Sequence, residues 1–317
     1  MKRVLEVGDK TSLIPSVITF DSHPGSFING NTIPLINSPE DRADLLRRVF
    51  GIEDIIFLHF DKTTVSMAWD RFIDHLIEEF GARYLVAGND FRFGFNAEGS
   101  SRLLAEMCAK ANIGCDIIPD VLYDGIVSNS TYIRELLIAG DMERANAFLG
   151  HPHVLTDVVR YGYKLGRTLG TPTINMRFAP GVLVPAFGVY ATKIYLEDWK
   201  FTTVDSGHTQ NTNVPIVNAN VSIVNANVPI VNANVPIGVT NIGIRPTVDD
   251  SGQTTAETHI LDFQQNLYGH KVRIEFYKRL RPEIKFSTVA ELKEQIQKDC
   301  KAASEYFSCQ SGNTMLK

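Results

Sequence analysis

Short apolar runs and amphipathic stretches alternate along residues 16–150 of the chain. The apolar runs have the length of buried strands, and the stretches between them carry apolar residues at the spacing of one helix face. This alternation is typical of βαβ units on a parallel sheet, where ligands collect at the carboxyl ends of the strands. We therefore expect an α/β domain here. Its expected strands and helices are residues 16–20, 41–50, 54–60, 68–80, 84–88, 101–112, 115–121 and 130–150.

After Gly150 the pattern changes to β-rich segments separated by turn residues. Helical periodicity returns only in residues 288–307, where Ser287 or Thr288 can serve as the N-cap. We therefore expect the second half to form a small antiparallel β-barrel closed by a terminal helix. The expected strands are residues 154–162, 171–178, 188–196, 237–243, 257–263 and 271–280.

Residues 213–240 hold an internal repeat, four copies of a seven-residue unit: NVPIVNA, NVSIVNA, NVPIVNA and NVPIGVT. Because seven is odd, successive copies in a strand would send equivalent side chains to opposite faces, and the prolines would remove hydrogen-bond donors. The Asn, Val and Pro content disfavours a helix as well. We interpret the repeat as an insertion at about residues 203–237, a projecting loop or loose hairpin without a role in the chemistry. Its Val and Ile content also suits self-association.

The composition is that of a soluble globular protein, with 44% hydrophobic, 21% charged and 9% aromatic residues among 317. This length allows two domains, each with its own core. No run reaches the roughly 18 apolar residues of a membrane span, and the amino terminus lacks the apolar core of a signal peptide. We therefore expect a cytoplasmic protein with no membrane partner.

Charge and cysteine content exclude two further classes. The formal net charge of −5 disfavours a nucleic-acid-binding surface, which needs clustered positive charge, but it leaves room for local basic sites that bind a small phosphorylated ligand. The four cysteines lack the spacing of a zinc site or a disulfide framework, so we expect buried or inert thiols. They are Cys108, Cys115, Cys300 and Cys309.

The stretch GYKLGRTLGTPTIN, residues 162–175, suits phosphate chemistry. Its glycines let backbone N–H groups approach phosphate oxygens, and its two basic residues add positive charge. Thr173 and Asn175 present two neutral oxygens on one face of an extended segment, where both can bind a hard cation such as Mg²⁺. A glycine-rich turn between strands would give the same pattern, so a second feature must decide.

The second feature is Glu257, a carboxylate near the start of an otherwise apolar strand. Taken alone, such a residue is more often on a solvated face than a catalytic base. The segments that accompany Glu257 in the sequence decide between these two interpretations. The stretch at 162–175, followed in order by VTNIGIRPTV (239–248), ETHILDF (257–263), LYGHKVRIEF (267–276) and LRPEIKF (280–286), strongly resembles the riboflavin kinase module.

The resemblance implies a role for each matching residue. Thr173 and Asn175 correspond to the family's Pro-Thr-x-Asn motif, which binds magnesium and the ATP phosphates, and Glu257 corresponds to the catalytic carboxylate that accepts a proton from the riboflavin hydroxyl. Arg281 is a candidate for the flavin side, although a surface arginine near the last helix would fit its position equally. The residues expected to cover the ATP phosphates are Gly162, Lys164, Gly166, Arg167, Thr168 and Gly170.

The upstream half resembles the FMN adenylyltransferase module of the prokaryotic bifunctional riboflavin kinase/FAD synthetase. The matching segments are AGNDFRFGFNAEG (87–99) and SNSTYIRELLIAGDMERANAFLG (128–150). We therefore expect residues 1–148 to form a Rossmann-like nucleotidyltransferase domain and residues 149–310 a riboflavin kinase domain. Its nucleotide and flavin ligands are expected at a strand end and a helix amino terminus, although Asp90 and Arg134 could instead form a structural ion pair. These ligands are Asn89, Asp90, Phe91, Ser130, Thr131 and Arg134.

The chain departs from the family at its start. The family's module begins with a Gly-x-Phe-Asp-Gly-Val-His-x-Gly-His type motif, but TFDSHPGSF at 19–27 has the wrong spacing, and PSVITFDSHPGSF at 15–27 matches the family's second strand better. On that register residues 1–10 are the tail of the first helix, and the first strand, its phosphate loop and most of that helix are absent. Adenylyl transfer is then expected to be absent or severely weakened. A start assigned too late would give the same sequence and a fully bifunctional enzyme.

The leading hypothesis is an enzyme of flavin-cofactor biosynthesis that phosphorylates riboflavin to FMN with ATP and Mg²⁺. A non-catalytic flavin- or nucleotide-binding protein is the alternative from another class. The presence of Thr173, Asn175 and Glu257 favours the enzyme, since binding alone does not need a base. A third possibility is that the amino-terminal half is mainly an assembly or docking domain.

Overall fold

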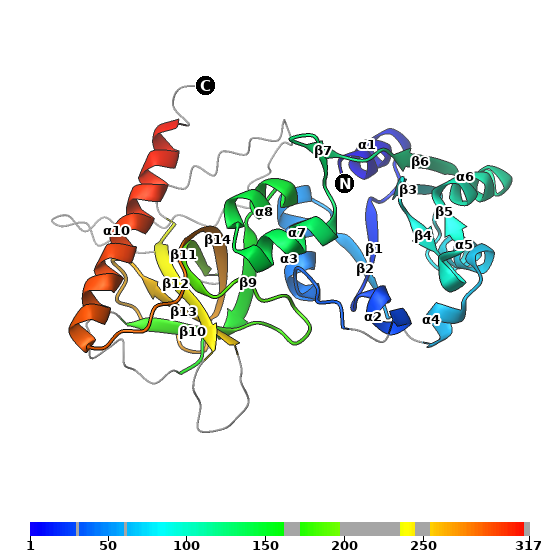
Figure 1. Cartoon of the computed structure of the whole chain (residues 1–317). Helices are drawn as coiled ribbons and strands as arrows, with labels where there is room; N and C mark the ends of the chain where they lie inside the picture. The colour runs from blue at the N-terminus through cyan, green and yellow to red at the C-terminus, as the bar shows by residue number, and fades with distance from the viewer. Residues whose placement is uncertain (30–31, 60–61, 162–171, 197–234, 245–253, 314–317) are drawn as a thin grey trace. The chain divides into compact units, whose positions relative to one another are not determined.

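The computed structural model describes residues 1–29, 32–59, 62–161, 172–196, 235–244 and 254–313 (Figure 1). The chain divides into two compact units. Unit 1 comprises Met1–Arg134 and Ala179–Leu183, and unit 2 comprises Glu135–Phe178 and Val184–Lys317. The domain limits at 148/149 and 310 stay predictions, because a division by contacts is not a division by ancestry. No helix in the described ranges is long and apolar enough to cross a membrane.

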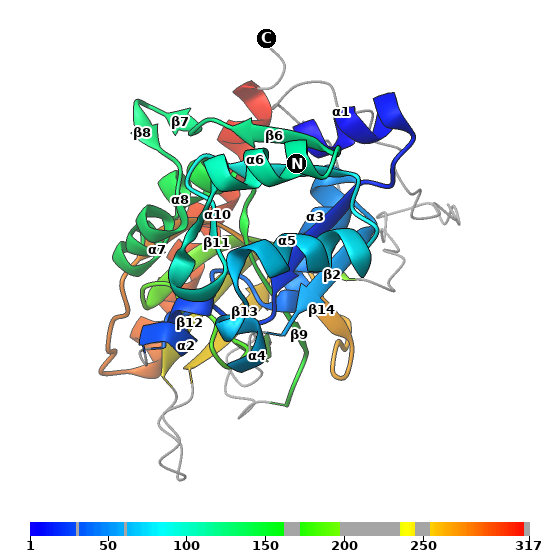
Figure 2. The ribbon, with the colours of Figure 1, turned by 90° about the vertical axis from the view of Figure 1, so that its right-hand side faces the viewer.

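Unit 1 is built on two pairs of parallel strands, β1 with β2 and β3 with β6. β1 and β2 lie side by side in both views (Figures 1 and 2). The expected alternation of strands and helices is present. The elements are α1 Lys2–Thr11, β1 Ser16–Phe20, α2 Pro24–Asn29, α3 Pro39–Phe50, β2 Asp54–Leu58, α4 Lys62–Ser66, α5 Trp69–Glu78, β3 Tyr84–Gly88, β4 Arg92–Phe93, η1 Phe95–Ala97, β5 Gly99–Ser100, α6 Ser101–Lys110, β6 Gly114–Ile118, β7 Leu122–Tyr123, β8 Ile126–Val127 and α7 Ser130–Ala139, whose last five residues fall in unit 2.

Local sequence explains where the helices of unit 1 begin and which face they bury. The Ser38 side chain accepts a hydrogen bond from the Asp41 backbone N–H, and α3 ends at Gly51, whose φ of 68° suits a glycine. On α5, Phe72, Ile73 and Leu76 fall on one face and are buried. They form a core cluster with Phe93, Leu104 and Cys108 from the neighbouring elements.

Unit 2 is a curled antiparallel sheet of six strands in the order β10-β13-β12-β11-β14-β9. Just beyond β9, the Arg160 N–H donates to the Asn175 carbonyl on β10 at 2.9 Å, so the two edges of the sheet meet. The predicted barrel with a terminal helix is therefore confirmed as a curled half-barrel. The elements are α8 Met142–Leu149, β9 His153–Val158, β10 Thr173–Arg177, β11 Gly188–Leu196, β12 Ile237–Ile244, β13 Thr254–Ile260, β14 Lys271–Arg281 and α10 Val289–Asn313.

Alternation along the strands gives the sheet two buried regions. Met176, Ile242, Ala256 and Ile274 are fully buried, as expected for side chains that fill a barrel. Another core cluster joins residues of β11 and β12 to α10, namely Val189, Ala191, Val239, Ala303 and Phe307.

The terminal helix begins where the sequence predicts. The Thr288 hydroxyl accepts from the Glu291 N–H at 3.2 Å, and the Glu291 carboxylate accepts from the Ser287 N–H at 3.0 Å. Thr288, rather than Ser287, is therefore the N-cap, in a reciprocal capping arrangement. Residues 213–234 of the repeat lie outside the described residues, and its last residues form the start of β12.

The buried His153 on β9 should make the folded protein less stable in acid. The ring is 0% exposed, lies 5.9 Å from the Phe276 ring centroid, and burial lowers its pKa to about 3. Because the unfolded imidazole titrates near 6.5, only the unfolded state binds this proton between about pH 3 and 6.5, and stability rises with pH through that window. We expect His153→Leu to reduce the loss of unfolding free energy between pH 6.5 and 5 by about 2 kcal/mol. Urea unfolding at both pH values measures this loss, with the exposed His270→Leu as control. Equal acid sensitivity of His153→Leu and the parent protein would contradict the prediction.

Candidate functional site

One row of polar side chains crosses three strands of unit 2. Asn175 on β10 lies directly opposite Glu257 on β13, which in turn lies opposite Asn241 on β12. Residues directly opposite in an antiparallel sheet project from the same face, with Cβ atoms about 4.5–5.5 Å apart. Thr173 lies two residues before Asn175 and shares that face. The register therefore gathers the hydroxyl, the amide and the carboxylate that the sequence singles out.

The row lies on a rigid part of the sheet. Asn175 is buried, and Thr173 and Glu257 are half-buried. A chain of buried hydroxyls holds the strands together on the opposite face, where Thr240 Oγ1 lies 2.9 Å from Thr192 Oγ1 and 2.8 Å from Thr258 Oγ1. Because this polar network is closed and buried, it fixes the strands that carry the row.

A pocket lies beside Thr173. It is lined by the start of β10, the end of β13 and the loop that follows β13, residues 263–268. The Tyr268 ring stacks on Tyr161 with centroids 4.0 Å apart, and Phe263 adds a second aromatic side chain. The other predicted phosphate ligands come just before the pocket-lining residue Pro172 in the sequence, but they lie outside the described residues. These ligands are Gly162, Lys164, Gly166, Arg167, Thr168 and Gly170.

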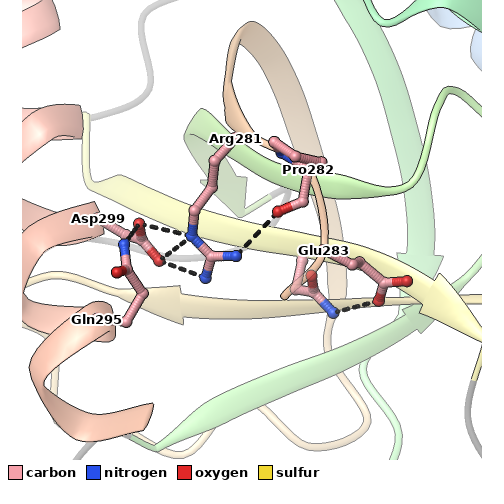
Figure 3. Close-up of polar contacts among 6 residues, drawn as sticks. Arg281, Pro282, Glu283, Gln295 and Asp299 are labelled. Atoms are coloured by element: carbon pink, nitrogen blue, oxygen red, sulfur yellow. Dashed lines mark hydrogen bonds and ion pairs between the residues drawn. The ribbon is translucent and has the colours of Figure 1, made fainter. Parts of the chain in front are cut away.

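Arg281 is anchored to the terminal helix and is not a free surface residue (Figure 3). Its Nε and Nη2 donate to the Asp299 carboxylate at 2.7–3.1 Å, and its Nη1 donates to the Pro282 carbonyl at 3.0 Å. Gln295 Nε2 donates to the same carboxylate at 2.9 Å. The Arg281 side chain is 15% exposed and that of Asp299 only 5%.

Asn241 lies in the row and Glu283 contacts it, but the sequence pattern singles out neither residue. The Asn241 amide donates to Glu283 Oε1 at 3.5 Å. Figure 3 shows Glu283 next to the Arg281 anchor. Both residues lie in segments that carry the family resemblance, VTNIGIRPTV and LRPEIKF. The polar residue in each of those two segments is the sequence feature from which Asn241 and Glu283 could have been identified.

In unit 1, Asn89, Asp90 and Phe91 follow β3, at its carboxyl end as predicted. The Asn89 N–H donates to the Ile118 carbonyl at the end of β6 at 2.9 Å, and the Phe91 ring stacks on Phe93 at 5.2 Å. Asn89 and Asp90 are exposed, so their polar atoms are accessible to a ligand.

Ser130, Thr131 and Arg134 lie on the first turns of α7, also as predicted. The cap is Asn129, whose side-chain oxygen accepts from the Tyr132 N–H at 2.9 Å. Arg134 Nε donates to the Pro34 carbonyl at 2.9 Å. The alternative of an Asp90–Arg134 ion pair is wrong, since that pair is not among the ion pairs of the described residues.

Arg42 and His23 extend this positively charged region of unit 1. Arg42 Nη1 donates to Thr19 Oγ1 at 2.7 Å and to the Phe20 carbonyl at 2.8 Å. Burial lowers the pKa of His23, and the nearby charges of Arg134 and Arg42 lower it further. The end of β1 and the start of α7 therefore share one electropositive environment.

Comparison with known proteins gives the site its chemical context. The riboflavin kinase family model matches residues 149–307, and the FAD synthetase model matches residues 1–132. The bifunctional riboflavin kinase/FMN adenylyltransferase of Bacillus subtilis is 32% identical over 308 residues, which cover 96% of this chain and 85% of that protein. The chain belongs to this bifunctional family. The protein of the same name from Haemophilus influenzae is 30% identical over 310 residues, which cover 97% of this chain and 89% of that protein.

A solved structure agrees on the fold. The crystal structure described as a macrolide-efflux protein from Streptococcus pneumoniae aligns with a TM-score of 0.72 and 24% identity, covering 96% of this chain and 87% of that chain. At this identity the likeness shows the fold alone. The family membership confirms the predicted resemblance, fold class and enzymatic nature: the chain is an enzyme of flavin-cofactor biosynthesis, with an FAD synthetase domain followed by a riboflavin kinase domain.

Proposed function

We propose that unit 2 transfers the γ-phosphoryl group of ATP to the terminal hydroxyl of riboflavin, with Glu257 as the general base. The observation that carries this proposal is the row Asn175–Glu257–Asn241, which sets a carboxylate beside neutral oxygen ligands on one face of a rigid sheet. Phosphoryl transfer asks a protein mainly for positioning and charge neutralisation. Glu257 meets that need because it lies in the row between the phosphate ligand Asn175 and Asn241, where the acceptor hydroxyl can approach.

The donor set fits Mg²⁺. The Thr173 hydroxyl and the Asn175 amide oxygen are hard, neutral ligands on one face, and Mg²⁺ in kinases is held by one or two protein oxygens together with the substrate phosphates and water. The described residues hold no cluster of three His, Cys, Asp or Glu side chains that would bind a metal without a substrate. The cation would neutralise the charge on the ATP phosphates.

Glu257 accepts the proton of the ribityl hydroxyl as that oxygen attacks the γ-phosphorus, while the bond from the phosphorus to the bridging oxygen of ADP breaks. We assign the nucleotide to the aromatic pocket beside Thr173 and its phosphates to residues 162–170, which precede that pocket in the chain. The acceptor side is then the other end of the row, toward Asn241. The exposed apolar side chain of Ile284, the residue after Glu283, supports this end as the place of the flavin ring.

The decisive assay incubates the purified chain with riboflavin, ATP and Mg²⁺ and separates riboflavin, FMN and FAD by chromatography. We expect FMN to form, and we expect its formation to stop when EDTA removes the cation. Riboflavin that stays unphosphorylated at saturating ATP and Mg²⁺ would refute the proposed function. FMN that forms at an undiminished rate in EDTA would refute only the roles of Thr173 and Asn175 as cation ligands.

The second activity that we propose is the transfer of AMP from ATP to FMN in unit 1. The support is the position of Asn89, Asp90 and Phe91 after β3 and of Ser130, Thr131 and Arg134 at the start of α7, both suited to a nucleotide. Incubation with FMN and ATP, with FAD and pyrophosphate as readouts, tests it. The absence of both products while FMN synthesis proceeds would limit the chain to riboflavin phosphorylation.

A further inference from the structure

Glu283 brings a second carboxylate close to Glu257. It lies two residues after Arg281, the last residue of β14, and its Oε1 accepts from the Asn241 amide, the cross-strand neighbour of Glu257. Both carboxylates thus neighbour one amide, Glu257 across the strand pair and Glu283 through a hydrogen bond. The mechanism derived above uses only the first of them.

The backbone of β12 leaves a place for this carboxylate. A Cβ atom added to Gly243 would meet Glu283 Oε1 at 2.0 Å and Asn241 Nδ2 at 3.4 Å. The carboxylate therefore rests directly against the strand, in the space beside Gly243. Gly243 pairs with Thr255, two residues before Glu257 on β13, so Glu283 over Gly243 lies diagonally across from Glu257, at the roughly 7–8 Å that separates such neighbours.

The anchor in Figure 3 fixes the segment that carries Glu283. Arg281 holds the buried Asp299 carboxylate of α10 and the Pro282 carbonyl at the same time. Pro282 then restricts the backbone just before Glu283. The side chain of Glu283 is exposed, so it remains accessible to a substrate.

We propose that Glu283 is a specificity-determining residue that binds a hydroxyl of the acyclic polyol chain of the acceptor, while Glu257 binds the hydroxyl that reacts. This inference rests on the proposed function of unit 2. A carboxylate accepts hydrogen bonds from hydroxyl groups, and a hydrogen bond to a charged acceptor is stronger than one to a neutral acceptor. Two carboxylates at this diagonal spacing match two hydroxyls a few carbon atoms apart on one chain. Asn241 orients Glu283 as a positioning residue.

The test compares riboflavin with an isoalloxazine that lacks the polyol chain and can only inhibit. We expect Glu283→Gln to raise the KM for riboflavin about tenfold, since a hydrogen bond to a charged group is replaced by one to a neutral amide. The KM for ATP, the kcat and the inhibition constant of the chain-less isoalloxazine should stay within twofold. Glu294→Gln, which removes an exposed carboxylate on α10 far along the chain from the row, is the matched control.

Two results would overturn the proposal. One is a riboflavin KM that Glu283→Gln leaves within twofold of the parent value. The other is a rise in the inhibition constant of the chain-less isoalloxazine that parallels the rise in the riboflavin KM, because Glu283 would then serve the ring or the fold. Glu283→Asp, which keeps the charge, should fall between the parent and Glu283→Gln. If the parent protein forms no FMN at all, the proposed function fails, and this outcome is distinct from both results above.

Discussion

Replacing Glu257 by glutamine is expected to slow FMN formation by about a thousandfold, the usual contribution of a positioned general base. The amide keeps the size and polarity of the side chain but cannot accept the proton of the attacking hydroxyl. Because the row Asn175–Glu257–Asn241 is held by backbone pairing, the substitution should leave the neighbours in place. Initial rates by chromatography give the loss in kcat, and quenching of riboflavin fluorescence gives the affinity for the flavin, which should change little.

A matched control exists at the far end of the same strand. Asp262 is an exposed carboxylate just beyond β13, with a φ of 53° that asparagine tolerates, so Asp262→Asn removes the same charge without a change at the row. We expect near-normal turnover for it. Full turnover of Glu257→Gln would exclude Glu257 as the base. Loss of flavin binding in step with turnover would show that the carboxylate holds the substrate instead.

The sequence was sufficient for most elements of the fold and for the residue types of the site. It missed the short helices α2 and α4, and the stretch 130–150, expected as one element, is divided into α7 and α8. Alternating apolar positions predict the strands of unit 2, and helical spacing with Thr288 as N-cap predicts α10. The placement of Thr173 and Asn175 on one face follows from the period of two in a strand. These are local properties, which is why a linear pattern reveals them.

Contacts between distant segments could not be predicted in the same way. The pairing of Asn175 with Glu257 depends on the register between two strands far apart in the chain, and only the family resemblance pointed to it. Asn241 and Glu283 meet because the segment after β14 returns to β12, where the Glu283 carboxylate lies against Gly243. The ion pair considered for Asp90 and Arg134 fails for a related reason, since Arg134 reaches a backbone carbonyl of a loop that no pattern positions.

The substitution Asp299→Asn is expected to destabilise unit 2 strongly, because it breaks the ion pair with Arg281. The substitution leaves a guanidinium that is only 15% exposed without its counter-charge, and breaking such a pair from one side costs about 3–5 kcal/mol. We therefore expect the urea midpoint of unit 2 to fall strongly, whereas Glu294→Gln on the exposed face of the same helix should not shift it measurably. A midpoint of Asp299→Asn within experimental error of the parent would show that the pair does not hold α10.

Removing both charges separates the stability of the fold from the role of Arg281 on the flavin side. In Arg281→Met combined with Asp299→Leu no buried charge is left unpaired, so we expect the urea midpoint to return close to the parent value. We expect the KM for riboflavin to be raised in this double variant all the same, because Arg281, the candidate residue on the flavin side, is absent. A KM that recovers together with stability would reduce Arg281 to a structural residue. If the KM stays high, the chain-less isoalloxazine decides between two routes: weaker inhibition means that Arg281 contacts the ring, and unchanged inhibition means that it acts by holding Glu283 over Gly243.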